Sequence, residues 1–283
     1  MNQLNLKKIL SSIRSFPSMP ATGAKMLTML EDPETSVDEI EDVLRHDPGL
    51  TGNVLKLANS AYFGIPSKVS SVRQAVLLLG LKKLIQLVVA SCVSAVMDKP
   101  VPGYNLPPGD LWRHSIAVSI AAEALVKDKK NIDANDIFTP ALLHDIGKLI
   151  LGHFVKDELE DIEKIAGKGT PYVVAENMVL GTDHAEIGAL ILTQWSFPSD
   201  VIAAVRWHHD PDFPEQANVP IDIVYLSNLL CQTSGNGNED GGPSYDLSPT
   251  VIERLGIDLR QIDTIAGNVA QWVDELAEAL TFH

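Results

Sequence analysis

The chain has 283 residues, of which 45% are hydrophobic and 21% are charged, and its formal net charge at pH 7 is −15. This length and apolar fraction are enough for the core of one large domain or two modest ones. The acidic excess repels phosphate backbones and anionic lipid, so we expect no sequence-independent binding to nucleic acid or membrane, although the net charge leaves room for a local basic patch.

The N-terminal segment MNQLNLKKIL lacks an apolar core of signal-peptide length, so secretion is not indicated. The longest uncharged run, residues 84–97, is shorter than the roughly 20 residues that span a bilayer, and we interpret it as a buried helix. Cys92 and Cys231 lie among apolar residues without a CxxC spacing. This usage favours buried, reduced thiols and a cytoplasmic location.

Apolar residues recur at helical spacing along nearly the whole chain, and no segment shows sustained alternation. We therefore predict an all-α fold. Capping boxes mark helix starts at Ser36 with Glu39, Ser71 with Gln74, and Asp183 with Glu186. Prolines typical of first helical turns follow Thr170 and Ser248, at Pro171 and Pro249.

Two stretches rich in helix-breaking residues divide the chain. Residues 99–109 contain four prolines and two glycines and predict an extended connector. Residues 234–244 are polar and glycine-rich and predict a mobile loop, followed from about residue 248 by one short and one long helix. The predicted organisation is an N-terminal helical half at 1–100, a half at 101–235 that holds the candidate site, and a closing segment at 236–283.

Five of the eight histidines and one aspartate lie in or beside apolar helical segments. They are His114, His144, Asp145, His184, His208 and His209. Imidazole and carboxylate groups are the usual protein ligands of Zn, Fe, Mn and Ni. A single convergent metal site is therefore the first hypothesis.

The segment ALLHDIGKLIL places His144 and Asp145 in a run that would otherwise be a wholly buried helix. Burying both without a strong partner would cost several kcal/mol, so something must pair with them. Because adjacent helical residues point about 100° apart, the pair suits different faces of a site, or two ions, better than one tetrahedral ion. The doublet His208 and His209 repeats this arrangement.

Each histidine also has a plainer interpretation. His114 lies four residues after Asp110 on one helix face, so both could point at one centre, but alone it would be typical of a hydrogen-bonded core residue. The doublet could serve a helix C-terminus, and His184 could be an exposed first-turn residue. Three other histidines are predicted to lie outside the site: His46 at a helix end, His153 on the face opposite His144, and His283 at the last position.

The spacing of the six candidate residues resembles the HD superfamily of metal-dependent phosphohydrolases, named for its His-Asp pair. The N-terminal half is more specific, because HDPGLTGNVLKLANSAYFG and SSVRQAVLLLGLKKLIQLV are similar to the HDOD family, the HD-related output domain of bacterial signalling proteins. The resemblance runs from about residue 16 to residue 232. It implies an N-terminal helical bundle packed against an HD-like bundle, and a role as a signalling output or scaffold acting through protein–protein contacts.

The related HD-GYP phosphodiesterases suggest roles for the candidate residues. By this resemblance, His114, His144, Asp145, His184, His208 and His209 would bind one or two divalent transition-metal ions (Fe, Mn, Ni or Zn), with Asp110 as an extra candidate. Asp145 and Lys148 would be the catalytic residues. Asp145 would bridge ions or accept a proton, and Lys148 would contact a substrate phosphate.

Three features depart from the catalytic pattern. Asn228 stands where the HD pattern ends in an aspartate, and its neutral carbonyl would hold an ion less strongly. The GYP loop is absent, since HHDPDFPEQANVP follows the histidine doublet. No sensor domain is recognisable, so we expect the input to come from signalling proteins in trans.

Three hypotheses remain open. The favoured one is a cytoplasmic regulatory HDOD protein that retains a metal site and acts by protein–protein interaction. The second is a metal-dependent phosphohydrolase acting on nucleotides or cyclic dinucleotides. The third is a metal-free helical scaffold, which is awkward because clustered neutral histidines need hydrogen-bond partners.

Overall fold

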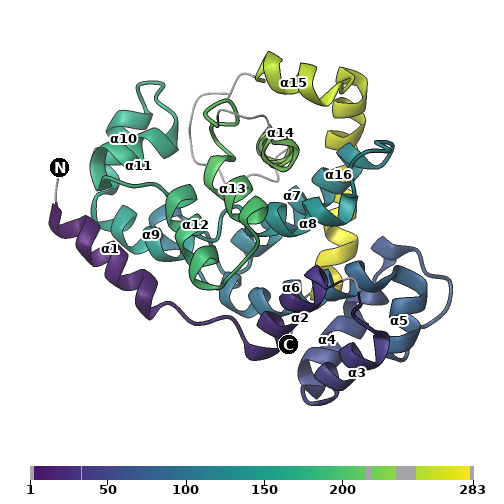
Figure 1. Cartoon of the computed structure of the whole chain (residues 1–283). Helices are drawn as coiled ribbons and strands as arrows, with labels where there is room; N and C mark the ends of the chain where they lie inside the picture. Colours follow the sequence, from purple (N-terminus) through teal and green to yellow (C-terminus); the bar gives the residue numbers. More distant parts are fainter. Residues whose placement is uncertain (1–2, 33, 215–217, 234–246, 281–283) are drawn as a thin grey trace. The chain divides into compact units, whose positions relative to one another are not determined.

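The computed structural model describes residues 3–32, 34–214, 218–233 and 247–280 (Figure 1). Over these residues the regular structure is helical and contains no strand, apart from one isolated antiparallel bridge between Val101 and Leu106. The all-α prediction is therefore confirmed. No helix in the described ranges has the length and hydropathy needed to cross a membrane.

The chain divides into two compact units. One comprises residues 1–17 and 97–270, and the other comprises residues 18–96 and 271–283. The long helix α16 (Leu259–Leu280) runs through residues of both units.

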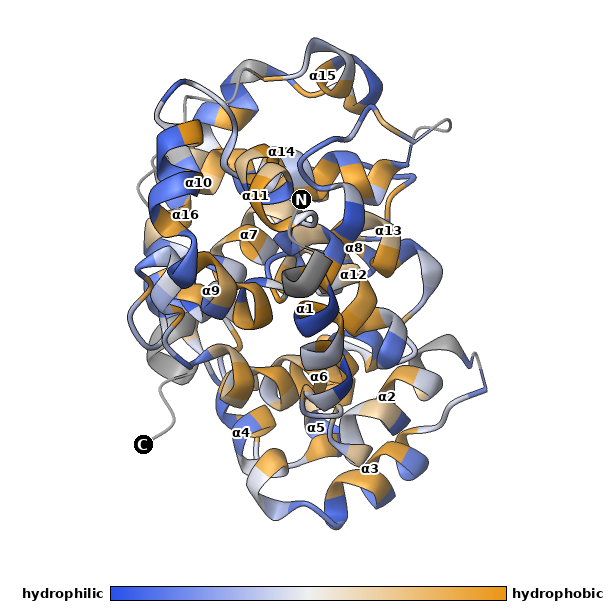
Figure 2. Ribbon diagram, turned by 90° about the vertical axis from the view of Figure 1, so that its left-hand side faces the viewer, coloured by the Kyte–Doolittle hydropathy of each residue, from blue (hydrophilic) through white to orange (hydrophobic). Residues whose placement is uncertain are grey.

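The unit that begins at residue 18 is built mainly from consecutive short helices. They are α2 (Ala21–Glu31), α3 (Val37–Arg45), α4 (Pro48–Ala58), η1 (Ala61–Phe63), α5 (Val72–Leu79) and α6 (Leu81–Met97). On α3, hydrophobic and hydrophilic residues separate onto different sides (Figure 2), and Ile40, Val43 and Leu44 are buried. The Leu84–Met97 run lies within α6 and is largely buried, as predicted.

The larger unit holds the remaining helices. They are α1 (Gln3–Ser15), η2 (Pro102–Tyr104), α7 (Asp110–Val126), α8 (Ala134–Leu143), α9 (Lys148–Asp157), α10 (Leu159–Ala166), α11 (Tyr172–Leu180), α12 (His184–Gln194), α13 (Ser199–Trp207), α14 (Val219–Thr233) and α15 (Pro249–Leu255). Helices α7, α8 and α14 pack together to form the centre of this unit. Helix α13 contacts α8, α12 and α14, which places the end of α13 against the same core.

The predicted helix starts agree with the structure, with differences in detail. Ser36 and Glu39 form a complete capping box. Ser71 and Asp183 each accept a bond from the backbone N–H three residues later, but their Gln74 and Glu186 partners bond to Ser70 and Thr182 instead of the cap residue. Pro249 lies at the first position of α15, whereas Pro171 is the N-cap of α11.

The connector at residues 99–109 is more compact than the extended segment predicted. The Val101–Leu106 bridge closes it around η2, and Tyr104 is buried. Gly103 packs so closely on α9 that a Cβ atom there would lie 2.1 Å from the carbonyl oxygen of Gly152. The connector is therefore a tight loop whose prolines are exposed and whose Val101, Gly103, Tyr104 and Leu106 are buried.

Two other predictions concern the C-terminal part and the cysteines. The loop predicted at residues 234–244 lies outside the described residues, while α15 and α16 are the expected short and long helices. Cys92 and Cys231 are both buried and free, as predicted. Burial raises the pKa of the Cys92 thiol to about 11.

Candidate metal centre

The six candidate residues come from four places in the larger unit. His114 lies in the second turn of α7, and His144 and Asp145 occupy the turn between α8 and α9. His184 is the first residue of α12, and the doublet of His208 and His209 directly follows α13. The structure brings side chains separated by up to 95 positions in the chain to one point.

Gly147 allows the turn that carries His144 and Asp145 to approach α12. A Cβ atom at Gly147 would lie 1.9 Å from the carbonyl oxygen of His184 and 2.6 Å from the amide nitrogen of Gly188. Any side chain at this position would therefore push the turn away from α12. The glycine in the HDIGK segment thus has a direct role in assembling the cluster.

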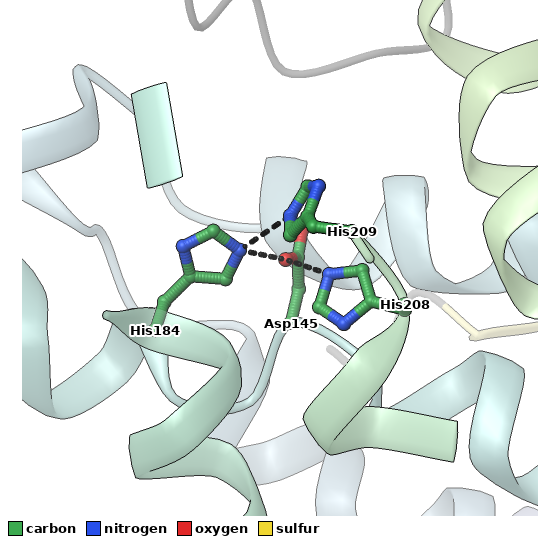
Figure 3. A group of neighbouring side chains, drawn as sticks. All are labelled: Asp145, His184, His208 and His209. Carbon is green, nitrogen blue, oxygen red and sulfur yellow. Dashed lines mark hydrogen bonds and ion pairs between the residues drawn. The ribbon is translucent and has the colours of Figure 1, made fainter. Parts of the chain in front are cut away.

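The Asp145 carboxylate lies at the centre of the cluster (Figure 3). Its Oδ2 atom is 3.5 Å from Nε2 of His114 and 3.3 Å from Nε2 of His144. Its Oδ1 atom is 3.4 Å from Nε2 of His184 and 3.8 Å from Nε2 of His208. The two carboxylate oxygens therefore face two different groups of histidines.

The potential ligand atoms form two groups that share Asp145. One group contains Asp145, His184, His208 and His209, and the other contains His114, His144 and Asp145; the ligand atoms within each lie within 4.8 Å of one another. Nε2 of His184 and Nε2 of His209 are 2.9 Å apart. Ligands bonded to one ion at about 2.0–2.2 Å lie roughly 3–3.5 Å from each other, so most of these spacings suit a shared cation.

Hydrogen bonds on the outer side of the rings fix the orientation of three histidines. Nδ1 of His144 donates to the carbonyl oxygen of Ala141 at 2.7 Å, and Nδ1 of His208 donates to that of Val205 at 2.7 Å. Nδ1 of His184 donates to Glu176. Because these acceptors have no proton to give, Nδ1 carries the proton in each ring, and Nε2 faces the cluster as it does in histidines that bind metals.

Several buried polar atoms of the described residues make no hydrogen bond. Those of the cluster are Nε2 of His144, Nε2 of His208 and both carboxylate oxygens of Asp145, of which Oδ2 has the ion pair with Lys148 at 3.1 Å. Buried acceptor atoms are costly unless a donor or a cation satisfies them. These residues therefore fit a divalent metal as ligands. The metal would be the partner that the buried His144 and Asp145 require.

The cluster is almost closed to solvent. His114, His144, Asp145, His184 and His208 are each at most 2% exposed, and only His209 is partly exposed. Burial lowers the pKa of His208 and His209 well below the ordinary histidine value, and neighbouring imidazoles add to this. Both rings are therefore neutral and able to act as ligands at neutral pH.

Charges inside the cluster act differently on Asp145 and His184. Burial alone would raise the pKa of Asp145, but the charge of Lys148 holds that pKa well below its ordinary value. Burial would lower the pKa of His184, but Glu176, by its charge and its hydrogen bond, raises it instead. Asp145 is consequently a carboxylate in the folded protein.

Lys148 and Asn228 lie beside the group formed by His114, His144 and Asp145. Nζ of Lys148 is 3.1 Å from Oδ2 of Asp145, and the side chain is 3% exposed. Oδ1 of Asn228 is 3.1 Å from Nε2 of His114. Asn228 therefore occupies the position at the site that was expected for it.

Two residues of the site were missed by sequence reasoning. Glu176 on α11 is fully buried, and it accepts hydrogen bonds from the Tyr104 hydroxyl at 2.7 Å and from the backbone N–H of His184 at 2.9 Å. An acidic residue in the mostly apolar segment YVVAENMVL was the available signal for Glu176. Tyr104 gave none, because it lies in the proline-rich connector.

The other candidates lie outside the cluster. Asp110 is exposed at the first residue of α7, so it does not join the buried group. His46 caps the C-terminus of α3, and its Nδ1 bonds to the carbonyl oxygen of Asp42, as expected for a helix end. His153 is exposed, and His283 lies outside the described residues.

The helical fold and the buried histidine–aspartate cluster define an HD-like protein. The HDOD domain family matches residues 16–211, and the chain belongs to that family. The chain is also 26% identical over 246 residues to an uncharacterized protein of Treponema pallidum (strain Nichols). That match covers 85% of this chain and 46% of the relative, so the chain spans about half the length of this curated relative.

Two solved structures share the fold. An HDOD domain protein of unknown function from Geobacter sulfurreducens has a TM-score of 0.83 and 22% identity, with 99% of this chain and 98% of that one covered. A candidate phosphohydrolase from Shewanella amazonensis SB2B has a TM-score of 0.74 and 24% identity, with coverages of 96% and 98%. At these identities the likeness concerns the fold alone.

Proposed function

We propose that the chain is a regulatory HDOD protein of the cytoplasm that binds signalling proteins supplied in trans. In this proposal the histidine–aspartate cluster holds a divalent transition metal, one of Fe, Mn, Ni or Zn, which braces the helices and serves structure or sensing. The single observation that carries the proposal is the burial of the cluster. Five of its six candidate ligands are at most 2% exposed.

Burial bears on function because a phosphate ester must reach the metal to be hydrolysed. In this protein His209 is the one candidate ligand with partial exposure. Lys148, the residue that would contact a substrate phosphate, is itself buried and directed at Asp145. The arrangement favours a metal that holds structure over a metal that receives substrate.

A surface on the smaller unit supports the partner-binding part of the proposal. Residues 48–97 contain five basic and no acidic side chains, and Arg73 on α5 pairs with Asp38 and Glu41 of α3. Within this stretch Leu77 and Leu78 on α5 are 80% and 47% exposed. Large exposed apolar side chains suit contact with an apolar face of a partner protein.

The alternative function is hydrolysis of a nucleotide or cyclic dinucleotide. It is favoured by one feature, the position of Asp145 between two groups of ligands. Bound divalent ions would lower the pKa of a water molecule and polarise a phosphate. Asp145 would orient both ligand groups and accept a proton, and Lys148 would have to leave Asp145 in order to contact the phosphate.

The experiment that separates the two functions is an activity screen on the metal-loaded full chain. Cyclic dinucleotides, nucleoside phosphates and bis(p-nitrophenyl) phosphate are the substrates, and a His184→Ala variant is the background control. We expect no turnover above that background. Turnover that requires added metal and disappears in the variant would establish the alternative.

Partner binding needs its own test. Signalling proteins encoded by neighbouring genes are purified and titrated with the full chain and with Leu77→Glu. Met178→Glu is the matched control, since Met178 is also exposed but lies on α11. We expect Leu77→Glu alone to weaken binding, and equal binding by both variants would argue against this surface.

A further inference from the structure

The two halves of the cluster differ in the charges that surround them. Asp145 divides the cluster, with Oδ1 toward His184 and His208 and Oδ2 toward His114 and His144. We refer to the Oδ1 side, including His209, as the first half and to the Oδ2 side as the second half. Because their contacts differ, the two halves should bind a cation with different affinity.

The second half already contains a positive charge. The ammonium group of Lys148 lies 3.1 Å from Oδ2 of Asp145 and is almost completely buried. This ammonium group is paired with Oδ2, the same carboxylate oxygen that would bind an ion shared with His114 and His144. A divalent ion there would meet the repulsion of a buried ammonium group.

The second half also lacks an additional negative ligand. Oδ1 of Asn228 faces Nε2 of His114 at 3.1 Å, so this ring nitrogen donates a hydrogen bond to the amide oxygen and would have to give up that bond and change tautomer to bind an ion. Nε2 of His144 is therefore the one imidazole nitrogen of the second half that can face an ion without breaking a hydrogen bond.

The first half has the opposite character. Nε2 atoms of His184 and His208 lie 3.4 and 3.8 Å from Oδ1 of Asp145, with His209 beside them, whereas the ammonium group of Lys148 lies at the other oxygen, Oδ2. Behind His184 lies the fully buried carboxylate of Glu176, hydrogen-bonded to Nδ1 of the ring. A carboxylate behind a histidine makes that histidine a better metal ligand.

We propose that the cluster is built for a single divalent ion, held in the first half by Asp145, His184, His208 and His209. The ammonium group of Lys148 takes the position of a second cation. This inference rests on the metal-binding part of the proposed function. A single ion also favours the regulatory function over hydrolysis, because one ion cannot clamp both the attacking and the leaving oxygen of a phosphodiester as two ions do.

The sum of formal charges in the cluster supports one bound ion. Asp145 and Glu176 contribute two negative charges and Lys148 one positive charge, all in nearly solvent-free surroundings. One divalent ion brings the total to +1, whereas two would bring it to +3. A buried excess of charge is strongly unfavourable, so the second ion is disfavoured while Lys148 remains in place.

The test is the metal content of the full chain after removal of bound metal and dialysis against Zn²⁺ and, in parallel, Mn²⁺. We expect one ion per chain for the unaltered protein and for Lys148→Arg, which keeps the charge. Lys148→Met should gain a second ion. Two ions in the unaltered protein, or one in Lys148→Met, would overturn the inference while leaving metal binding intact.

If Lys148→Met does not fold, histidine variants test the same inference independently. We expect His114→Ala to keep its ion and His209→Ala to lose it, with folding of both checked by circular dichroism. Equal loss in both variants would overturn the assignment to the first half. An unaltered protein that takes up no ion at all would overturn the metal centre in the proposed function as well.

Discussion

Glu176 accepts two hydrogen bonds from His184, one from the backbone N–H at 2.9 Å and one from Nδ1 at 2.8 Å. Through these bonds the carboxylate ties α11 to the first residue of α12 and turns Nε2 of His184 toward Asp145. A third bond, from the hydroxyl of Tyr104, holds the carboxylate itself. The connector and α11 together therefore set the orientation of one candidate ligand.

Glu176→Gln should weaken metal binding without unfolding the protein. The amide keeps the size of the side chain but removes the charge that makes the His184 ring more basic, and such partners are worth about 10–100-fold in metal affinity. Competition with a chelator measures the change. Glu163→Gln, at an exposed position on α10, is the control. Equal affinities for the two variants would show that Glu176 does not support the site.

Gly147→Ala should disrupt the cluster. The added Cβ atom would lie 1.9 Å from the carbonyl oxygen of His184, and two backbone segments would have to separate. We expect a loss of about 1–3 kcal/mol in the free energy of unfolding, as for other overpacked positions, together with loss of bound metal. Urea denaturation and metal analysis give the two values.

Gly52→Ala is the matched control for that substitution. Gly52 lies within α4, and nothing stands within 4 Å of an added Cβ atom. Alanine is favoured over glycine inside helices by about 0.5–1 kcal/mol, so this variant should be as stable as the unaltered protein or more so. If both variants behaved alike, close packing at Gly147 would not be the cause.

The metal-free protein should lose stability as the pH falls below about 6.5. The pKa values of His208 and His209 are well below 6.5 in the folded state, so there the unfolded chain takes up protons that the folded chain does not. His184 has a raised pKa, and its contribution is present below 6.5 and lost as the pH rises through the raised value. Between pH 6.5 and 5 the contribution of His184 is nearly constant, so the lowered pKa values of His208 and His209 set the slope, roughly 1–2 kcal/mol per pH unit.

Urea denaturation of chelator-treated protein at pH 7, 6 and 5 measures this dependence. The exposed His153 provides a control, since His153→Gln should leave the slope unchanged. Constant stability over this interval would mean that the buried rings accept protons as readily as exposed ones do.

Arg254→Ala should cost more stability than a typical surface change. The guanidinium group bonds to both carboxylate oxygens of Asp222, at 2.8 and 2.6 Å, and Asp222 is 1% exposed. Without Arg254 this carboxylate is left buried and unpaired, although water can reach the site because Arg254 is 23% exposed. We expect a loss of about 1–3 kcal/mol in the free energy of unfolding.

Arg73→Ala is the comparison for the Arg254 variant. Arg73 also pairs with two carboxylates, Asp38 and Glu41, but its side chain is 53% exposed. Exposed pairs contribute about 0–1 kcal/mol, so this variant should remain close to the unaltered protein. Equal losses for the two arginines would contradict the role assigned to the burial of Asp222.

Much of the fold was predictable because helix formation leaves local signals. Apolar spacing gave the all-α class, and the Ser36–Glu39 box appears as predicted. The connector at 99–109 was predicted less well. Its prolines indicated where helices stop, but the burial of Tyr104 depends on α9, which lies about 50 residues further along the chain.

Part of the site was predictable because histidine is a rare residue in apolar helices. Histidines within apolar helices identified the candidates, and the structure brings the five histidines to Asp145 or its neighbours. The position of Lys148 on Asp145 and the support from Glu176 depend on distances in three dimensions. Lysine and glutamate are common on helix surfaces, so their sequence positions alone do not reveal burial.

The most direct test of the account is anomalous diffraction from crystals of the metal-loaded full chain, recorded at the absorption edge of the bound metal. We predict one strong peak enclosed by Asp145, His184, His208 and His209, with Lys148 still paired with Asp145. The absence of any peak at this cluster after metal supplementation would contradict the metal centre. A second peak of equal strength beside His114 and His144 would contradict the single-ion assignment.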